Sequence, residues 1–175
     1  RLAVPAPQAG PGLQPVAAAG AAVAASARMR GSWAVMVRCP APVPLPWDGA
    51  FINNGPLRWV ARDCSKPGRT VPLGTETWLL HASPEWSEAH IEDSADAVTG
   101  TLLAAFAALG GPAAHLVQAT AHRWRYADTE PALTQGHWWD ATACVGMCGD
   151  WLNGRKVEGA WLSGQSLAHQ LLQAR

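Results

Sequence analysis

The sequence has no excess of charge of either sign. Its 13 lysine and arginine residues balance 13 aspartate and glutamate residues, and charged residues make up only 15% of the 175. A protein that holds a phosphate backbone needs a basic surface, so we exclude nucleic acid as the main partner. Hydrophobic residues reach 49%. A chain of this size and composition should collapse around the core of one domain, or of two small ones.

Long hydrophobic runs are also missing. The most apolar stretch runs from Val16 to Ala27, and it is too short and too weakly hydrophobic to cross a bilayer. No signal peptide is visible. We therefore expect no membrane partner and a cytoplasmic location.

Cysteine is scarce and poorly spaced for a metal site. Cys144 and Cys148 lie close together, but no second close pair of Cys or His would complete a zinc site. We expect these two residues, together with Cys39 and Cys64, to be small buried hydrophobes in a reducing compartment. No metal ligand is predicted.

Tyrosine and phenylalanine are nearly absent, with one and two residues, whereas tryptophan occurs ten times. The indole N–H needs a partner when it is buried. We therefore expect many of the tryptophans at half-polar surfaces or in the walls of a pocket.

Strand-like and helix-like segments come in groups along the chain. Such grouping favours an α+β fold, a mostly antiparallel sheet with flanking helices. Ser83-Pro84 is typical of a helix start. The expected strands are 33–39, a short one within 47–56, 57–63, 76–82, 115–126 and 142–148, and the expected helices run from about 8 or 13 to 27, from 94 to 109 and from 159 to 173.

The C-terminal region carries the strongest local motif. An apolar strand ends in Gly149-Asp150, and a short loop leads to a helix that begins with small residues such as Gly159 and Ser163. Small residues let a flat ligand approach the backbone, and the free N–H groups of a helix start favour negative charge. An ordinary strand–loop–helix with a small packing face explains the same motif equally well.

The same residues carry a resemblance. The stretch from Gly149-Asp150 through 157–160 to Ser163-Gly164 resembles the C-terminal flavin-binding signature of the FAD-dependent amine oxidase superfamily. The segments 46–52, 57–59, 65–69, 81–87 and 123–126 are similar, in order, to renalase-like bacterial FAD-dependent oxidoreductases. The resemblance implies a C-terminal half: residues 1–8 as the end of an FAD-domain strand, 9–140 as the substrate-binding domain, and 141–175 as the strand and helix that complete the FAD-binding domain.

The resemblance also implies a cofactor and an activity. FAD would meet Asp150 at its ribityl chain and the backbone of 157–160 at its pyrimidine edge, and the last strand would join the parallel sheet of the FAD domain. Renalase-like enzymes oxidise misreduced isomers of NAD(P)H by hydride transfer to the flavin, with oxygen as electron acceptor. The implied cofactor-binding residues are Gly149, Asp150, Val157, Glu158, Gly159, Ala160 and Ser163.

Substrate contacts are expected from strand residues that could face the flavin. Aromatic walls suit a nicotinamide ring, and an arginine suits a phosphate or a carboxamide. Hydride transfer needs positioning more than proton abstraction, so no catalytic acid–base residue is assigned. The expected substrate residues are Asn53, Trp59, His81, Arg123, Trp124 and Tyr126.

One departure from the family pattern limits the prediction. No G-x-G-x-x-G, which would hold the FAD pyrophosphate, follows a strand in this sequence. We therefore expect the chain alone to be inactive, to retain FAD poorly, to need an N-terminal FAD-binding half as partner, and to self-associate through exposed apolar surface. The alternatives are a generic flavin amine oxidase, which the presence of only Lys66 and Lys156 disfavours, and a stand-alone α+β binding module without a redox role.

Overall fold

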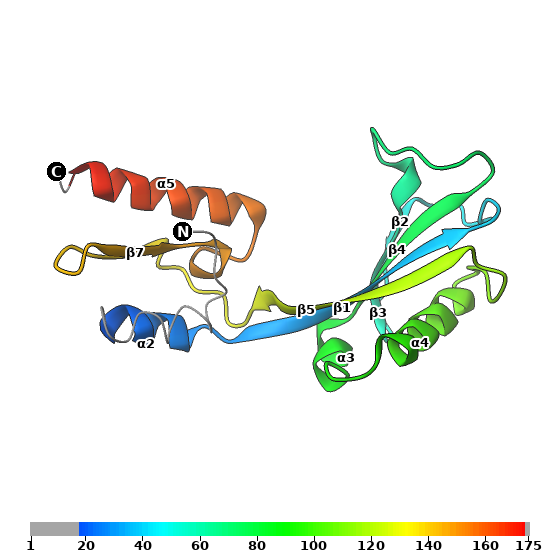
Figure 1. Ribbon diagram of the computed structural model, residues 1–175, viewed down its shortest axis with the longest axis horizontal. Helices are drawn as coiled ribbons and strands as arrows, with labels where there is room; N and C mark the ends of the chain where they lie inside the picture. The colour runs from blue at the N-terminus through cyan, green and yellow to red at the C-terminus, as the bar shows by residue number, and fades with distance from the viewer. Residues whose placement is uncertain (1–17, 174–175) are drawn as a thin grey trace. The chain divides into compact units, whose positions relative to one another are not determined.

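The computed structural model describes residues 18–173, which form two compact units (Figure 1). One unit spans residues 31–125, and the other combines 18–30 with 126–173. The strand end expected at residues 1–8, and the first part of the first expected helix, lie outside the described residues. The boundaries expected near residues 8 and 140 concern the domains of a larger enzyme, and they stay predictions.

A five-stranded sheet dominates the unit 31–125. The strands follow the order β2-β3-β4-β1-β5, and β2 with β3, β3 with β4, and β4 with β1 pair antiparallel. With the helices at its side, this sheet confirms the predicted α+β class. The strands are β1 (Met29–Cys39), β2 (Gly49–Phe51), β3 (Leu57–Arg62), β4 (Glu76–Ala82) and β5 (Gln118–Thr129).

Period-two burial explains why these segments are strands. In β4, Trp78, Leu80 and Ala82 are buried, while Leu79 and His81 between them are half-buried. Successive side chains of a strand point to opposite faces, so one face of the sheet is apolar and closed. The bounds of β4 match the expected strand.

Two helices cover that closed face, α3 (Pro84–Ala89) and α4 (Ala95–Ala108). Ser94 caps α4, because its hydroxyl accepts the N–H of Ala97 at 3.2 Å, and Ser83 caps α3 in the same way. A stripe of buried residues on α4 packs on the sheet, as its spacing predicts. The stripe consists of Val98, Leu102 and Phe106.

Trp78 lies at the centre of this core. It is 1% exposed, and its ring meets Phe106 at 5.3 Å and Trp47 at 5.5 Å between centroids. Its indole N–H donates to the buried carboxylate of Glu76 at 3.0 Å, and Arg62 pairs with the same carboxylate at 3.2 Å. The closed face therefore buries a tryptophan with its polar atom satisfied.

The second unit contains three helical elements and a hairpin. Met147 and Leu152 are buried in its core. The strand β6, which pairs antiparallel with β7, was not predicted. Cys144 and Cys148 are exposed, so the expectation that every cysteine is buried is wrong for this hairpin. The elements are α2 (Ala18–Ser26), β6 (His137–Asp140), β7 (Val145–Cys148), the short helix η2 (Asp150–Leu152) and α5 (Val157–Gln173).

Candidate functional site

The face of the five-stranded sheet that α3 and α4 leave uncovered is the candidate site, and we call it the open face. Alternate residues of each strand reach it, because their neighbours in sequence face the core. The register places Ala34 and Trp59 opposite His81, Met36 opposite Leu79, and Arg38 opposite Thr77. Within residues 31–125 the open face carries Ala34, Met36, Arg38, Trp59, Thr77, Leu79, His81, Gln118, Thr120, His122 and Trp124.

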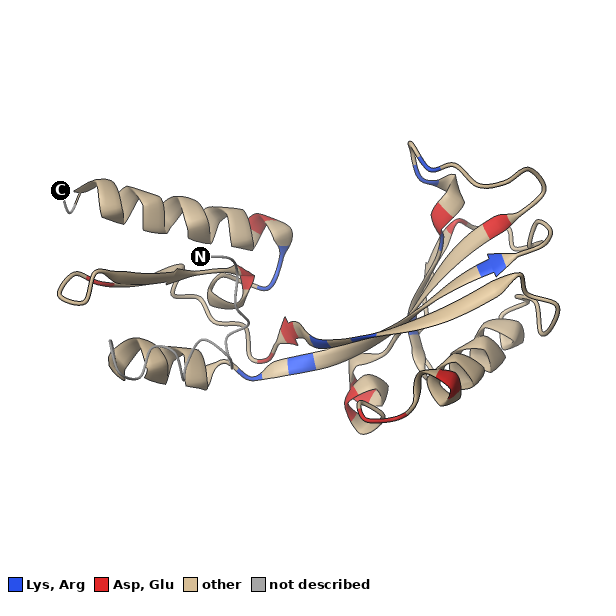
Figure 2. Ribbon diagram, viewed as in Figure 1, with Lys and Arg blue, Asp and Glu red and all other residues tan. Residues whose placement is uncertain are grey.

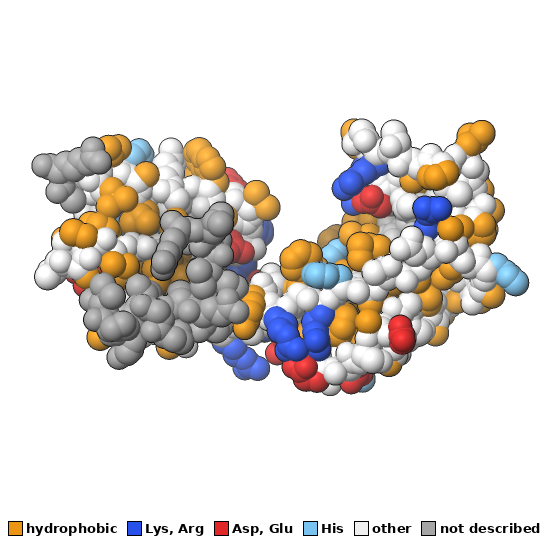
Figure 3. Space-filling model, viewed as in Figure 1, with side chains coloured by type: hydrophobic (Ala, Val, Ile, Leu, Met, Phe, Trp, Pro, Cys, Tyr) orange, Lys and Arg blue, Asp and Glu red, His pale blue; other side chains and the backbone are white. Residues whose placement is uncertain are grey.

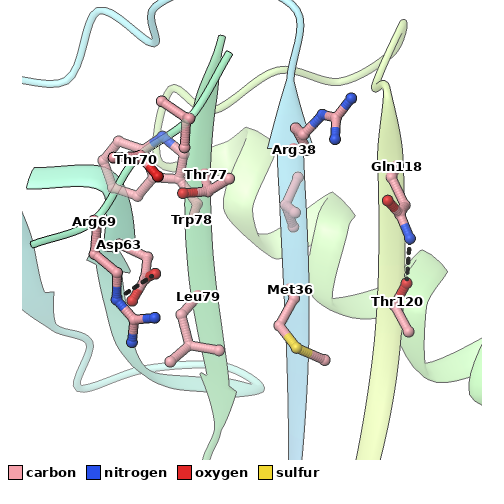
Figure 4. Close-up of a pocket in the computed structure, with 12 residues that line it drawn as sticks. Met36, Arg38, Asp63, Arg69, Thr70, Thr77, Trp78, Leu79, Gln118 and Thr120 are labelled. Atoms are coloured by element: carbon pink, nitrogen blue, oxygen red, sulfur yellow. Dashed lines mark hydrogen bonds and ion pairs between the residues drawn. The ribbon is translucent and has the colours of Figure 1, made fainter.

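A cavity of about 650 Å³ lies at one end of the open face (Figure 4). Its floor is formed by β4, β1 and β5, and the loop that follows β3 forms a wall. The lining mixes apolar side chains with hydroxyl, amide and guanidinium groups, as is typical of a small-molecule site. The lining side chains of the open face are Met36, Arg38, Thr77, Leu79, Gln118 and Thr120, and the loop adds Asp63, Arg69, Thr70 and Val71.

The charges in this cavity are unequally paired. Asp63 binds both Lys66, at 2.7 Å, and Arg69, at 3.4 Å. Arg38 has a buried Nε that no acceptor among the described residues reaches, and those residues form no ion pair with its guanidinium. The cavity therefore has a surplus of positive charge next to Arg38.

Aromatic rings fill the other part of the open face. Trp59 lies against Gly49, where an added Cβ would come within 2.7 Å of the indole, and its ring contacts Phe51 at 4.6 Å. His122 and Trp124 of β5 contact each other at 4.4 Å. These rings offer flat surfaces against which a planar ligand could stack.

His81 lies opposite Trp59 in the register of β3 and β4. Burial lowers the pKa of this imidazole from its ordinary value of 6.5, and the positive charge of Lys66 lowers the pKa further. A lowered pKa keeps the ring neutral at pH 7. His81 is therefore placed to offer one N–H or one ring nitrogen rather than a charge.

The expected substrate residues do not all lie together. Trp59, His81 and Trp124 are on the open face. Tyr126 lies two residues after Trp124 in β5, so its side chain points to the same side of the strand, but it belongs to the other unit. Asn53, in the turn after β2, lines a separate hollow of about 510 Å³.

Arg123 faces the covered side of the sheet instead. Its Nη1 donates to the carbonyl of Ile91 at 2.8 Å and pairs with Glu92 at 3.2 Å, and the guanidinium lies over the ring of Trp33 at 5.5 Å. Acidic residues are found on α3 and at the start of α4, on this side (Figure 2). Because adjacent residues of a strand point to opposite faces, Arg123 and Trp124 cannot both face one ligand.

Sequence reasoning missed the polar part of the cavity. Arg38, Gln118 and Thr120 were not among the expected substrate residues, although the alternation of apolar and polar residues along their strands indicates which side chains share a face. In β1 the residues Met36 and Arg38 interrupt a run of buried odd-numbered residues, which is the pattern of a strand with one accessible face.

The predicted cofactor segment forms the start of α5. Val157 is 90% exposed, Glu158 is exposed, and Ala160 is half-buried. Gly149 ends β7 with an extended backbone, and Asp150 is half-buried at the start of η2. The first turn of α5 is thus accessible to a ligand within the unit described.

Gly159 and Ser163 are buried by the chain itself. A Cβ at Gly159 would lie 2.0 Å from the carbonyl oxygen of Asn153. The hydroxyl of Ser163 accepts the N–H of Gly149 at 2.9 Å and donates to the carbonyl of Gly136. Local packing therefore accounts for these two small residues, and their contact with a cofactor stays a prediction.

Neither a metal site nor a membrane span is found in the described part of the chain. Residues 18–173 hold no group of three or more His, Cys, Asp or Glu side chains that could bind a metal ion. No helix within that range is both long enough and apolar enough to cross a bilayer.

Comparison with known proteins shows a shared fold. The sequence matches no protein-family model. The structure is similar to a protein assigned as a protoporphyrinogen oxidase from Exiguobacterium sp. 255-15, with a TM-score of 0.61, 13% identity and 73% of this chain covered. It is also similar to reduced UDP-galactopyranose mutase, with a TM-score of 0.63, 11% identity and 87% of this chain covered.

This chain spans 29% of the first and 35% of the second. At such low identity the likeness shows the fold alone, a fold that this chain shares with part of each of these longer chains.

Proposed function

We propose that this chain is part of an FAD-dependent oxidoreductase in which the open face forms one side of the substrate site. The observation that carries the proposal is the open face itself, a hollowed antiparallel sheet in a fold shared with flavoenzymes. Sheet faces with stacked rings and a few polar groups suit a planar substrate held against a flat cofactor.

The accessible start of α5 fits a flavin. Val157 and Glu158 are exposed in its first turn, where N–H groups have no acceptors within the helix. The positive end of the helix dipole stabilises nearby negative charge by about 0.3–1 kcal/mol. FAD, when bound, supplies the acceptor for the hydride. We propose that Asp150 and the backbone of 157–160 hold it, as the sequence motif predicts.

The residues of the open face would orient the substrate. Trp59 and Trp124 provide rings for stacking, and Trp124 is 54% exposed. His81, neutral because its pKa is lowered, can hydrogen-bond to a carboxamide without bringing a positive charge to the site. A dihydronicotinamide needs such positioning and no proton abstraction, which is why we propose a renalase-like substrate of this type.

Exposed apolar side chains on α5 are the observation behind our proposal that an FAD-binding half packs against this helix. Trp161 is 64% exposed and Leu172 is 67% exposed, and together with Val157 they lie on the helix side opposite Ser163. Figure 3 shows hydrophobic side chains at the surface of this unit. We propose that an FAD-binding half covers them, and that the chain by itself self-associates.

The absorption spectrum of a full-length parent tests the redox assignment. We expect a bound flavin band that isomeric dihydronicotinamides bleach under anaerobic conditions and that oxygen restores. Bleaching by amines instead would select a generic amine oxidase. A full-length parent without flavin would contradict the proposal.

Two controls sharpen that test. FAD titrated into the 175-residue chain should show no tight stoichiometric uptake, because no pyrophosphate-binding loop is present. In the parent, Trp124→Ala should slow bleaching at low substrate concentration, whereas Leu73→Ala, at a fully exposed position in the loop before β4, should leave the substrate dependence of bleaching unchanged.

A further inference from the structure

The cavity on the open face contains an arginine, Arg38, whose charge no carboxylate of the described residues neutralises. The buried Nε of Arg38 has no acceptor among residues 18–173, and its guanidinium makes no ion pair with them. A buried donor without a partner is costly, and a native site that keeps one has a use for it.

Three other arginines of the same unit form ion pairs with carboxylates, although the buried Nε of Arg62 also lacks a hydrogen-bond partner among the described residues. Arg62 meets Glu76 and Asp48, and Arg69 meets Asp63. Arg123 shares Glu92 with a neighbouring arginine. Arg38 differs from these three because it has no carboxylate partner among the described residues, and it differs from the exposed Arg58 because its Nε is buried in the lining of a 650 Å³ cavity.

The neighbours of Arg38 are suited to an oxyanion. Thr77 lies opposite it in the register of β1 and β4, and Gln118 of the adjacent strand β5 lines the same cavity (Figure 4). Gln118 donates to Thr120 at 3.3 Å, which leaves its second amide hydrogen available. Met36 and Leu79 provide the apolar part of the floor.

We propose that Arg38 anchors a monoanionic oxyanion of a small molecule whose apolar body lies on Met36 and Leu79. A guanidinium fork matches two oxygens of a carboxylate or of a phosphodiester. One unpaired positive charge balances one negative charge, and a dianion would keep an uncompensated charge in the cavity. The inference rests on the cavity of residues 31–125 and holds without a flavin.

Binding of aromatic probes to the 175-residue chain tests the proposal. Benzoate represents a carboxylate, methyl phenyl phosphate represents a phosphodiester, and benzamide is the neutral counterpart of benzoate. We expect at least one anion to bind about tenfold more tightly than benzamide, because a charge-assisted hydrogen bond replaces a neutral one. Tighter binding of benzoate would identify the oxyanion as a carboxylate, and tighter binding of methyl phenyl phosphate would identify it as a phosphodiester.

Variants locate the effect at Arg38. Arg38→Met should abolish the preference for the anion, and Arg38→Lys should keep only part of it because the fork is lost. Arg58→Met is the matched control, since this exposed arginine of β3 lines a different hollow. Circular dichroism establishes that each variant folds.

A measurement on the unmodified chain covers the case in which Arg38→Met does not fold. The Nε–H resonance of Arg38 should shift on titration with the preferred anion and should not shift with benzamide. Equal affinity for anion and benzamide, or an unmoved Arg38 resonance, would overturn the proposal. A parent without flavin whose Arg38 still binds the anion would sink the redox assignment alone.

Discussion

The two faces of the five-stranded sheet differ in how completely the protein uses its own groups. On the covered face Trp78 is 1% exposed, and every polar atom of Glu76 that the structure describes has a partner. On the open face Trp124 is 54% exposed and Met36 is 44% exposed, and Arg38 keeps a buried donor unused. The covered face is closed and its polar groups are paired, whereas the open face keeps large side chains accessible and leaves the Nε of Arg38 without a partner in the described chain.

The largest expected contrast comes from adjacent residues of β4. Trp78→Ala should lower the free energy of unfolding by about 3–5 kcal/mol, because it removes the ring between Phe106 and Trp47. Leu79→Ala, one residue along on the open face, should cost less than about 1 kcal/mol. Urea denaturation followed by circular dichroism measures both. Equal costs would mean that the open face is packed as tightly as the covered one.

A smaller contrast comes from the two acidic partners of Arg62. Glu76→Gln should cost about 1–3 kcal/mol, since the side chain is buried and accepts from Trp78 and from the N–H of Val43. Asp48→Asn should cost less than about 1 kcal/mol, because that carboxyl is largely exposed. The same denaturation assay compares them. If Asp48→Asn lowered the free energy of unfolding more than Glu76→Gln, the claim that the buried Glu76 is the more important partner of Arg62 would be wrong.

The smallest expected effect is the pH dependence of the free energy of unfolding that His81 of the open face causes. Because the pKa of His81 is lowered in the folded state, the unfolded chain binds a proton more readily as the pH falls through 6.5. The contribution of His81 to stability is therefore complete above 6.5 and is lost below it. Unfolding free energies at about pH 8 and about pH 5.5, on either side of the ordinary histidine pKa, should diverge more in the wild type than in His81→Gln. A pH dependence that His81→Gln leaves unchanged would show that other groups cause it.

Much of the fold was predictable because local signals agree with the tertiary structure. The strand β4 has the expected bounds, and α4 ends within a residue of the expected helix, since Ser94 caps it and Gly110, with a φ of 98°, terminates it. The strand β1 begins earlier than expected, at Met29, because Gly31 weakened the apolar pattern. That glycine is explained by the close approach of Ile91, 2.4 Å from where a Cβ would lie.

The site was less predictable than the fold. Arg123 was expected to contact substrate because of its residue type. Which face of the sheet its side chain reaches depends on its position in the alternation of β5 and on which face α3 and α4 cover, and composition encodes neither. The strand β6 was missed because Trp138 and Trp139 are both half-buried, so no alternation marks it. Arg38 was missed because its lack of a partner is a property of three-dimensional neighbours.

The hydroxyl of Ser163 connects three segments of the C-terminal unit. By joining the tip of β7 at Gly149, the residue before β6 at Gly136 and the second turn of α5, it makes these three segments a single rigid junction. The span from Asp150 to Val157 is then fixed by the fold rather than adjusted on binding. The flavin proposed for this end would have to match that span in order to contact both residues.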